Sequence, residues 1–210
     1  MAIEQVNFLD LVGPAAQIDA FRDLIIENYN KEDGKDWFDV RKWGVHRNEL
    51  DLATEGMNYS LIEFEDGGLP IIKNLKNGQK WLQMSFITRD GTMNETFLKA
   101  LSQKFQALVV LGFYNWEMMQ SITTRLAHNN YYNEEERDFD TDEERFEELV
   151  EKEADAAEFA DWSEEMIGAI ETQIKFEKER LLEEYYQQHS EPIIFPTAND
   201  LITNIKGQNR

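Results

Sequence analysis

The sequence contains no cysteine among its 210 residues, so it offers neither a disulfide framework nor a thiolate metal site. It also lacks long hydrophobic runs. The longest, such as 107–111, fall far short of the roughly 20 residues that span a bilayer. The opening residues, Met-Ala-Ile-Glu-Gln, show no basic region followed by an apolar stretch, so no signal peptide is expected. Together these absences predict a cytoplasmic protein without a membrane span.

Basic residues are scarce as well. Only 21 Lys and Arg stand against 42 Asp and Glu, which gives a formal net charge of −21. Because Lys and Arg make the main contacts to phosphates, this balance argues against direct binding of nucleic acid. It argues equally against docking on an anionic membrane surface. A charged partner of this protein is therefore expected to be basic.

The negative charge is concentrated in one segment, 134–165. These 32 residues hold 17 acids and 3 bases, so they carry two-thirds of the excess charge. The remainder is ordinary in composition, since 41% of the chain is hydrophobic and 12% is aromatic. The chain therefore has enough apolar residues to bury a core, with an acidic segment added to it.

Hydrophobic periodicity in the first half alternates between strand and helix patterns. Gly13-Pro14 separates the first strand from the first helix, and Thr92-Met-Asn-Glu95 has the pattern of a capping box before the second helix. The order β-α-β-β-α-β predicts a ferredoxin-like α+β fold, with both helices on one face of an antiparallel sheet. The expected strands are 3–12, 58–65, 79–88 and 107–114, and the expected helices are 14–29 and the stretch after Thr92.

After residue 114 the pattern changes. Residues 117–132 predict an added strand with a turn at 128–130, and Thr141-Asp-Glu-Glu144 predicts the start of an acidic helix. A further long helix, capped by Asp161 or Ser163, carries an apolar stripe. The expected organisation is a ferredoxin-like domain at 1–132, an acidic helical region (a helix hairpin) at 133–190, and a tail at 191–210.

The segment Asn7 to Arg22, with sequence Asn-Phe-Leu-Asp-Leu-Val-Gly-Pro-Ala-Ala-Gln-Ile-Asp-Ala-Phe-Arg, resembles the opening strand and helix of the YubB ferredoxin-like domain family. The pair Trp43-Gly44 is similar to that family as well. Members are small proteins common on plasmids, phages and other mobile elements. The resemblance covers roughly 1–130, implies the same fold and a mobile-element setting, and supplies no catalytic residues.

No motif for catalysis or metal binding is complete. Asp138, Asp140 and Asp142 have the spacing of the first three ligands of a calcium loop, but Glu143 and Leu149 stand where glycine and glutamate are required. The three histidines, His46, His128 and His189, show no ligand spacing. We therefore expect a protein that is not an enzyme and that holds no metal or cofactor.

The acidic segment invites a functional interpretation beyond a solvated helix face or linker. On a helix its like charges four residues apart cost roughly 1–2 kcal/mol together, a cost that a basic partner would offset. As one helix of about 48 Å it would carry about one acid per 2.8 Å. Duplex DNA has one charge per about 1.7 Å and a single strand one per about 3.4 Å, so the segment imitates a nucleic-acid backbone.

The leading hypothesis is thus a phage- or plasmid-type binding protein that blocks a basic nucleic-acid-binding surface, such as that of a host defence complex. Two alternatives stay open. One is a structural or accessory protein whose C-terminal helices form a hairpin or a homodimer seam through Ile167, Ile170, Ile174 and Leu181. The other is an enzyme with an unrecognised pocket. The residues expected to contact the basic partner are Glu143, Glu144, Glu147, Glu148, Glu151, Asp155 and Glu158.

Overall fold

The structure is a computed structural model of the chain, and its described residues form a large antiparallel sheet and three helices. The α+β class expected from the sequence is therefore confirmed. The described residues are 4–28, 30–32, 35–39, 61–63, 70–75, 78–89, 92–115, 121–138 and 164–189.

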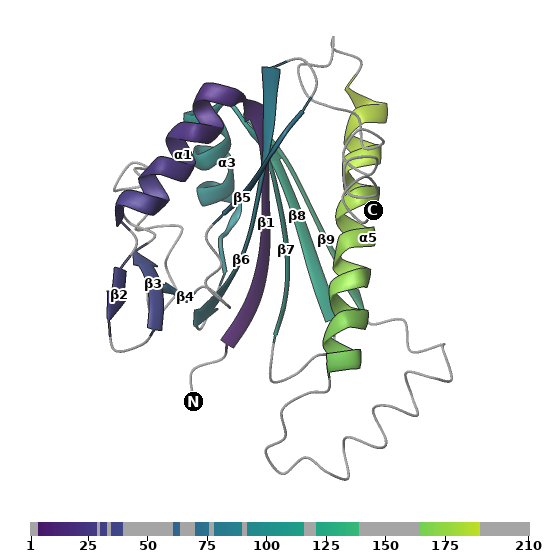
Figure 1. Ribbon diagram of the computed structural model, residues 1–210. Coiled ribbons are helices and arrows are strands. Elements are labelled where there is room, and N and C mark those ends of the chain that lie inside the picture. The colour runs from purple at the N-terminus through teal and green to yellow at the C-terminus, as the bar shows by residue number, and fades with distance from the viewer. Residues whose placement is uncertain are drawn as a thin grey trace, which may run out of the picture.

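The described elements follow one another as strands and helices in the order drawn in Figure 1. They are β1 (Glu4–Pro14), α1 (Ala15–Asn28), β2 (Asn30–Glu32), β3 (Lys35–Asp39), β4 (Leu61–Glu63), β5 (Ile71–Asn74), β6 (Gln79–Arg89), α3 (Glu95–Phe105), β7 (Leu108–Asn115), β8 (Ser121–His128), β9 (Tyr131–Asp138) and α5 (Glu164–Gln188).

The strands form a single sheet in the order β2-β3-β4-β6-β1-β7-β8-β9, and every pair of neighbours is antiparallel. β1 lies near the centre of the sheet and pairs with β6 on one side and with β7 on the other. β5 and β4 share the other edge of β6, where β5 pairs near Leu82 and β4 near Ile87.

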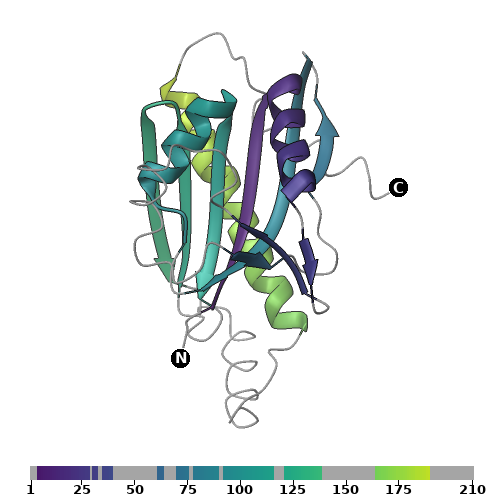
Figure 2. The same ribbon diagram turned by 90° about the vertical axis from the view of Figure 1, so that its left-hand side faces the viewer.

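Helices cover both faces of this sheet, as the two perpendicular views show (Figures 1 and 2). Successive side chains of a strand point to opposite faces. In β1, Leu9 and Leu11 therefore pack in the core with α1 and α3, while Val6 and Val12 pack in the clusters beneath α5. The prediction that α1 and α3 share one face is consistent with this packing, and α5 makes a third layer on the other face.

The start of α3 differs from the capping pattern predicted at Thr92. Asn94 is the N-cap, and its side-chain oxygen accepts a hydrogen bond from the N–H of Phe97 at 3.1 Å. Thr92 is used elsewhere, because its hydroxyl donates to Oδ1 of the buried Asn7 in β1 at 2.6 Å. An Asn at the position before Glu95 caps as well as Thr, so the helix begins two residues later than the box pattern indicated.

The helical region predicted from residue 133 onward is wrong at its beginning. Residues Asn133 to Asp138 belong to strand β9, which pairs with β8 residue for residue from His128↔Tyr131 to Ser121↔Asp138. Asn129 takes the left-handed conformation, φ 54°, that a tight hairpin turn requires. Because the turn is tight, each of the eight residues of β8 pairs with one residue of β9. The two strands are therefore equally long, even though β9 carries many charged side chains.

The apolar stripe of α5 was correctly predicted, but the homodimer seam assigned to it is wrong. Ile170, Ile174 and Leu181 are each 1% exposed, and they pack against strands of their own chain. A surface that is already buried within the chain is not available to a second copy. The side chain of Ile167, the fourth residue of that seam, lies outside the described residues.

Candidate functional site

The residues predicted to bind a basic partner, from Glu143 to Glu158, lie outside the described residues. The structure does place the two elements on either side of them, the end of β9 and the beginning of α5. Asp138 ends β9 and Glu164 begins α5, and both lie at the same end of the sheet (Figure 1). Residues 139–163, here called the acidic connection, therefore leave and rejoin the folded body at that end.

The first acids of the predicted segment are neutralised by cations of the same chain. Glu134 accepts a hydrogen bond from Arg125 Nε at 2.9 Å and another from the hydroxyl of Tyr132. Burial disfavours the Glu134 carboxylate, but these two hydrogen bonds outweigh it and lower its pKa. Arg125 is itself held by the carbonyl of Met93 at 2.6 Å and lies over the ring of Phe113. Glu134 is therefore part of the sheet surface near α3.

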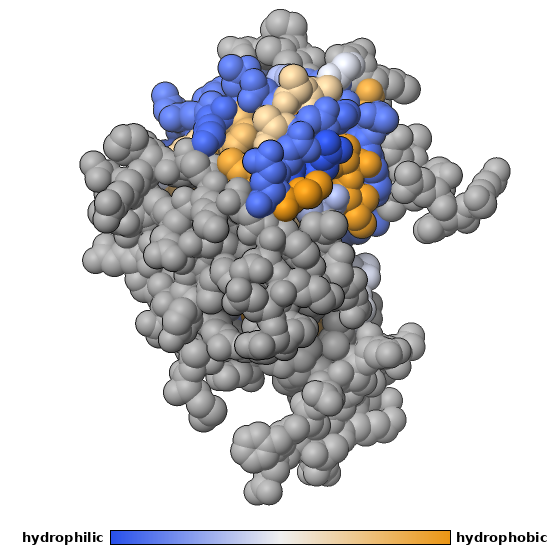
Figure 3. Space-filling view, turned by 60° about the vertical axis from the view of Figure 1, so that its left-hand side comes forward, coloured by the Kyte–Doolittle hydropathy of each residue, from blue (hydrophilic) through white to orange (hydrophobic). Residues whose placement is uncertain are grey.

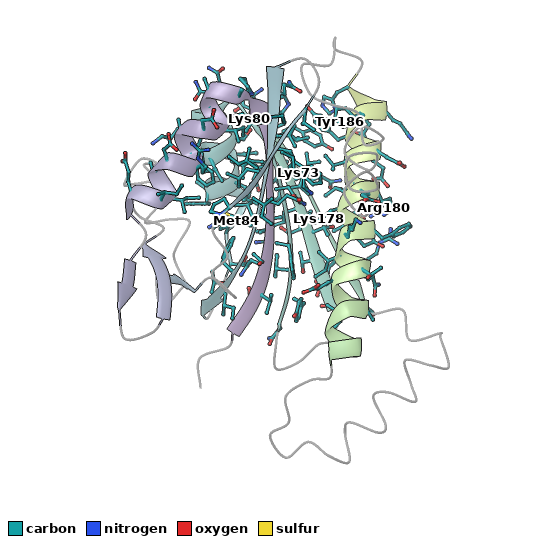
Figure 4. The ribbon with its side chains drawn as sticks, viewed as in Figure 1. Lys73, Lys80, Met84, Lys178, Arg180 and Tyr186 are labelled. Carbon is teal, nitrogen blue, oxygen red and sulfur yellow. The ribbon has the colours of Figure 1, made fainter. Side chains whose placement is uncertain are left out.

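On the other face of the sheet, Glu135 and Arg137 of β9 pair with α5. Arg180 bonds Glu135 and also Glu177, the latter at 2.9 Å, while Arg137 bonds Glu177 at 3.0 Å. Burial raises the pKa of Glu177, which Arg137 counteracts and Glu184 reinforces. Figure 4 shows Arg180 on α5 beside the strands. These pairs attach α5 to the edge strand.

A second buried pair lies nearer the middle of the sheet. Lys178 of α5 bonds the carboxylate of Asp10, and its Nζ also reaches the carbonyl of Phe8 at 3.3 Å (Figure 4). The indole N–H of Trp81 donates to the other oxygen of Asp10 at 2.8 Å. Every polar atom of this group has a partner, so we interpret it as a structural tether rather than a reactive centre.

The two described histidines, His128 and His189, both lie against Tyr185. His128 bonds the hydroxyl of Tyr185, and the ring of His189 stacks on Tyr185 at 4.2 Å. His128 Nε2 also contacts the side-chain amide of Asn129 at 3.3 Å, and Nδ1 of His189 lies 2.9 Å from the carbonyl oxygen of Tyr185. Within the described residues no group of three His, Asp or Glu side chains could hold a metal ion. His46 lies outside the described residues.

One hollow of about 290 Å³ opens on the face of the sheet that carries α1 and α3. Its walls come from four neighbouring strands, β1, β7, β8 and β9. It lies toward the end of the sheet at which β1 begins and β9 ends (Figure 1). The lining residues are Gln5, Phe113, Tyr114, Asn115, Ser121, Thr123 and Glu136.

Sequence reasoning missed this hollow, because its residues are 131 positions apart at the extremes and none belongs to a motif. Only the register of the sheet brings them together: Gln5 lies opposite Asn115 and Thr123 lies opposite Glu136. The period-2 pattern of each strand indicates which residues share a face, but no local signal indicates which strands are neighbours.

Elsewhere the described surface shows no extended apolar patch. The large hydrophobic side chains exposed there are Ile26, Ile71 and Phe176, which come from three different elements. Figure 3 shows the side of the molecule that carries α1, where hydrophobic and hydrophilic residues are interspersed. None of the described helices is long and apolar enough to cross a membrane.

Comparison with protein-family models, with curated proteins and with solved structures finds no match to this chain. The resemblance to the YubB family at residues 7–22 thus stays a prediction. Function has to be argued from the charges and the geometry of the chain itself.

Proposed function

We propose that this protein is a non-enzymatic binding protein whose acidic connection imitates nucleic acid and blocks a basic nucleic-acid-binding surface of another protein. The contacting residues are those predicted from the sequence: Glu143, Glu144, Glu147, Glu148, Glu151, Asp155 and Glu158. A phage- or plasmid-type protein directed at a host defence complex fits this activity, in keeping with the mobile-element family that residues 7–22 resemble.

The observation that carries the proposal is the difference in charge balance between the described body and the acidic connection. In the described body, cations such as Arg125, Arg180 and Lys178 are bonded to acids of the same chain. The acidic connection, by contrast, holds 11 acids and only two bases, Arg145 and Lys152. Excess negative charge in one stretch attracts a basic groove over long range and in a salt-sensitive way.

The placement of the ends supports the same conclusion. Because β9 and α5 are both packed on the sheet, the acidic connection is attached to the body at two points, Asp138 and Glu164. A segment held at both ends loses less conformational freedom on binding than a free tail, and this favours affinity. A cytoplasmic location is consistent with a nucleic-acid-binding target.

We also propose that the first half of the chain is an elaborated ferredoxin-like unit. The strand order β7-β1-β6-β5, antiparallel throughout, supports this, as do the connections of β1 to β5 through α1 and of β6 to β7 through α3. In this interpretation β8, β9 and α5 are additions that extend one edge of the sheet and cover its second face.

The function is tested by reversing charge within the acidic connection. The variant Glu143→Lys/Glu147→Lys/Glu151→Lys/Asp155→Lys is compared with Glu27→Lys/Glu171→Lys/Glu179→Lys/Glu183→Lys, which changes the net charge equally at sites on α1 and α5. Both are used, beside the unaltered chain, to capture proteins from a host lysate at low and at high salt.

The expected result is capture of a nucleic-acid-binding protein by the unaltered chain and by the control variant, but not by the variant reversed in the connection. Duplex or single-stranded nucleic acid should displace the captured protein, and high salt should weaken the capture. Equal capture by all three chains, or capture that nucleic acid does not displace, would show that the acidic connection is not a nucleic-acid mimic.

A further inference from the structure

The polar hollow at the end of the sheet has a composition that the structural role of the sheet does not require. Besides Phe113 and Tyr114, the residues that line it comprise two with amide side chains, two with aliphatic hydroxyls and one with a carboxylate. Further up this face of the sheet, Leu9, Leu111 and Ala127 lie in the core with α1 and α3. The hollow therefore begins where the helical cover of this core ends.

Two of the residues that line the hollow carry acceptor atoms with hydrogen-bonding capacity to spare. The Oε1 atom of Gln5 is buried and has no hydrogen-bond partner, which is costly for a buried polar atom. Across the hollow, the carboxylate of Glu136 receives a hydrogen bond from the hydroxyl of Ser121 at 2.8 Å. Among the described residues no cation pairs with Glu136, although its neighbours Glu134 and Glu135 each have an arginine.

The chemistry of these groups suits an organic cation. A guanidinium or an ammonium group donates several hydrogen bonds and accepts none, so a carboxylate, a free amide oxygen and hydroxyl oxygens are its natural partners. The ring of Phe113 already has the guanidinium of Arg125 at 4.8 Å from its centroid. Because Arg125 is paired with Glu134, its positive charge does not make the hollow favour an anion.

The size of the hollow limits the ligand. Pockets for drug-sized molecules and cofactors measure about 300–1,000 Å³, and this hollow, at about 290 Å³, falls just below that range. It therefore suits one side chain rather than a nucleotide or a cofactor.

The position of the hollow points to the source of that side chain. Glu136 precedes the end of β9 by two residues, and the acidic connection begins directly after Asp138. A basic surface drawn to the acidic connection would therefore meet the hollow next. We propose that the hollow lined by Gln5, Ser121 and Glu136 receives one arginine or lysine side chain of the basic partner, a proposal that rests on the function proposed above.

The first experiment uses isolated side-chain groups. The ¹⁵N-labelled full chain is titrated with N-acetyl-arginine methylamide, and separately with the matching citrulline compound, which is isosteric but uncharged. The arginine compound should shift the backbone amides of Ser121 and Thr123 and the side-chain amide of Gln5. The citrulline compound should bind about tenfold more weakly or not at all, because it lacks the charge that strengthens the hydrogen bonds.

Variants identify the acceptors. Glu136→Gln keeps an oxygen that can accept from Ser121 but removes the charge, and Gln5→Met removes the unpaired acceptor at similar volume. Each should weaken the arginine compound, Glu136→Gln by about tenfold. Glu183→Gln removes one carboxylate from α5, remote from the lining of the hollow, and should change the affinity less than about twofold. Amide spectra of the three variants establish that each is folded.

The outcomes separate this proposal from the proposed function. The cation site would be overturned if the arginine compound causes no shifts, or if Glu136→Gln does not alter them. The proposed function of the acidic connection would be unaffected, because the charge-reversal experiment tests it separately. The arginine compound could bind at the hollow while Glu136→Gln captures the lysate partner with the same efficiency as the unaltered chain does. In that case the hollow takes a free small cation, and its role as a partner contact is overturned. If both binding and capture weaken together, the proposal is supported.

Discussion

The two faces of the sheet are built differently. On the face with α1 and α3, 18 buried apolar residues form one continuous cluster that includes Leu9, Phe86 and Phe97. On the face with α5, the apolar residues form two separate clusters of eight and five. Between them lie the Asp10–Lys178 pair and the buried Glu177. On the first face the Lys80–Asp19 ion pair joins β6 to α1 beside this apolar cluster, whereas on the second face charged pairs lie between the apolar clusters.

This difference has a physical consequence for the position of α5. Apolar packing is non-directional, so a stripe of Ile and Leu alone would tolerate a helix displaced by one turn. A buried ion pair tolerates no such shift, because each displaced charge would be left without its partner. Gly112 adds a steric constraint, since a Cβ at this position would lie 2.5 Å from Ile174 and 3.0 Å from Lys178. We infer that these contacts determine the register of α5 on the sheet.

The largest effect is expected from Phe97→Ala on the apolar face. Phe97 is 1% exposed within the continuous cluster, and its truncation should cost about 3–5 kcal/mol of the free energy of unfolding, measured by urea denaturation. Leu181→Ala on α5 should cost less, because Leu181 belongs to a smaller cluster of eight buried residues. Ile26→Ala, at a side chain that is 47% exposed, is the control and should change stability by less than about 0.5 kcal/mol. A larger loss from Leu181→Ala than from Phe97→Ala would reverse the comparison.

The next effect is expected from Lys178→Met on the face with α5. This change keeps the apolar stem but leaves the carboxylate of Asp10 buried with the indole N–H of Trp81 as its donor. The expected loss is about 3 kcal/mol, again by urea denaturation. The double variant Asp10→Asn/Lys178→Met should recover most of that loss, since no unpaired charge remains. Failure of the second change to restore stability would mean that the pair contributes packing rather than charge compensation.

A smaller effect is expected from Gly112→Ala. Its new methyl group would overlap Ile174, so the variant should lose about 1–3 kcal/mol in the same denaturation assay. Ile174→Ala alone should also destabilise the protein, by leaving a cavity. In the double variant the added methyl occupies part of that cavity. The double variant should therefore lose less stability than the sum of the losses in the two single variants. Simple additivity would contradict a direct contact between the two residues.

The smallest effect concerns Glu134 and pH. Its pKa in the folded protein lies below the unfolded value of 4.5, so its pairing stabilises the fold above that pH and is lost as the pH falls through the lowered pKa. Because the side chain is 42% exposed, solvent screening limits the contribution to less than about 1 kcal/mol. In Glu134→Gln the difference in stability between pH 7 and pH 3 should shrink slightly, relative to Glu183→Gln as control. An unchanged difference would indicate that Arg125 and Tyr132 do not favour the Glu134 carboxylate in solution.

Several elements were predictable because their signals are local. The strand at the start of the chain, the helix after Pro14 and the stripe of α5 follow from periodicities of two and 3.6 residues, and the structure confirms them at Glu4–Pro14, Ala15–Asn28 and Glu164–Gln188. β9 was missed because Glu134, Glu135 and Glu136 are poor strand formers by propensity. The pairing with β8 and the cations Arg125 and Arg180 override that propensity.

The candidate site divides in the same way. By itself the sequence determined the amount of negative charge, its concentration at 134–165 and the expectation of a basic partner, because net charge depends only on composition and order along the chain. Only the tertiary structure decided which of those acids are already paired and where Gln5, Ser121 and Glu136 meet. Long-range strand pairing and the packing of α5 create these contacts, and neither leaves a signal within any short stretch of sequence.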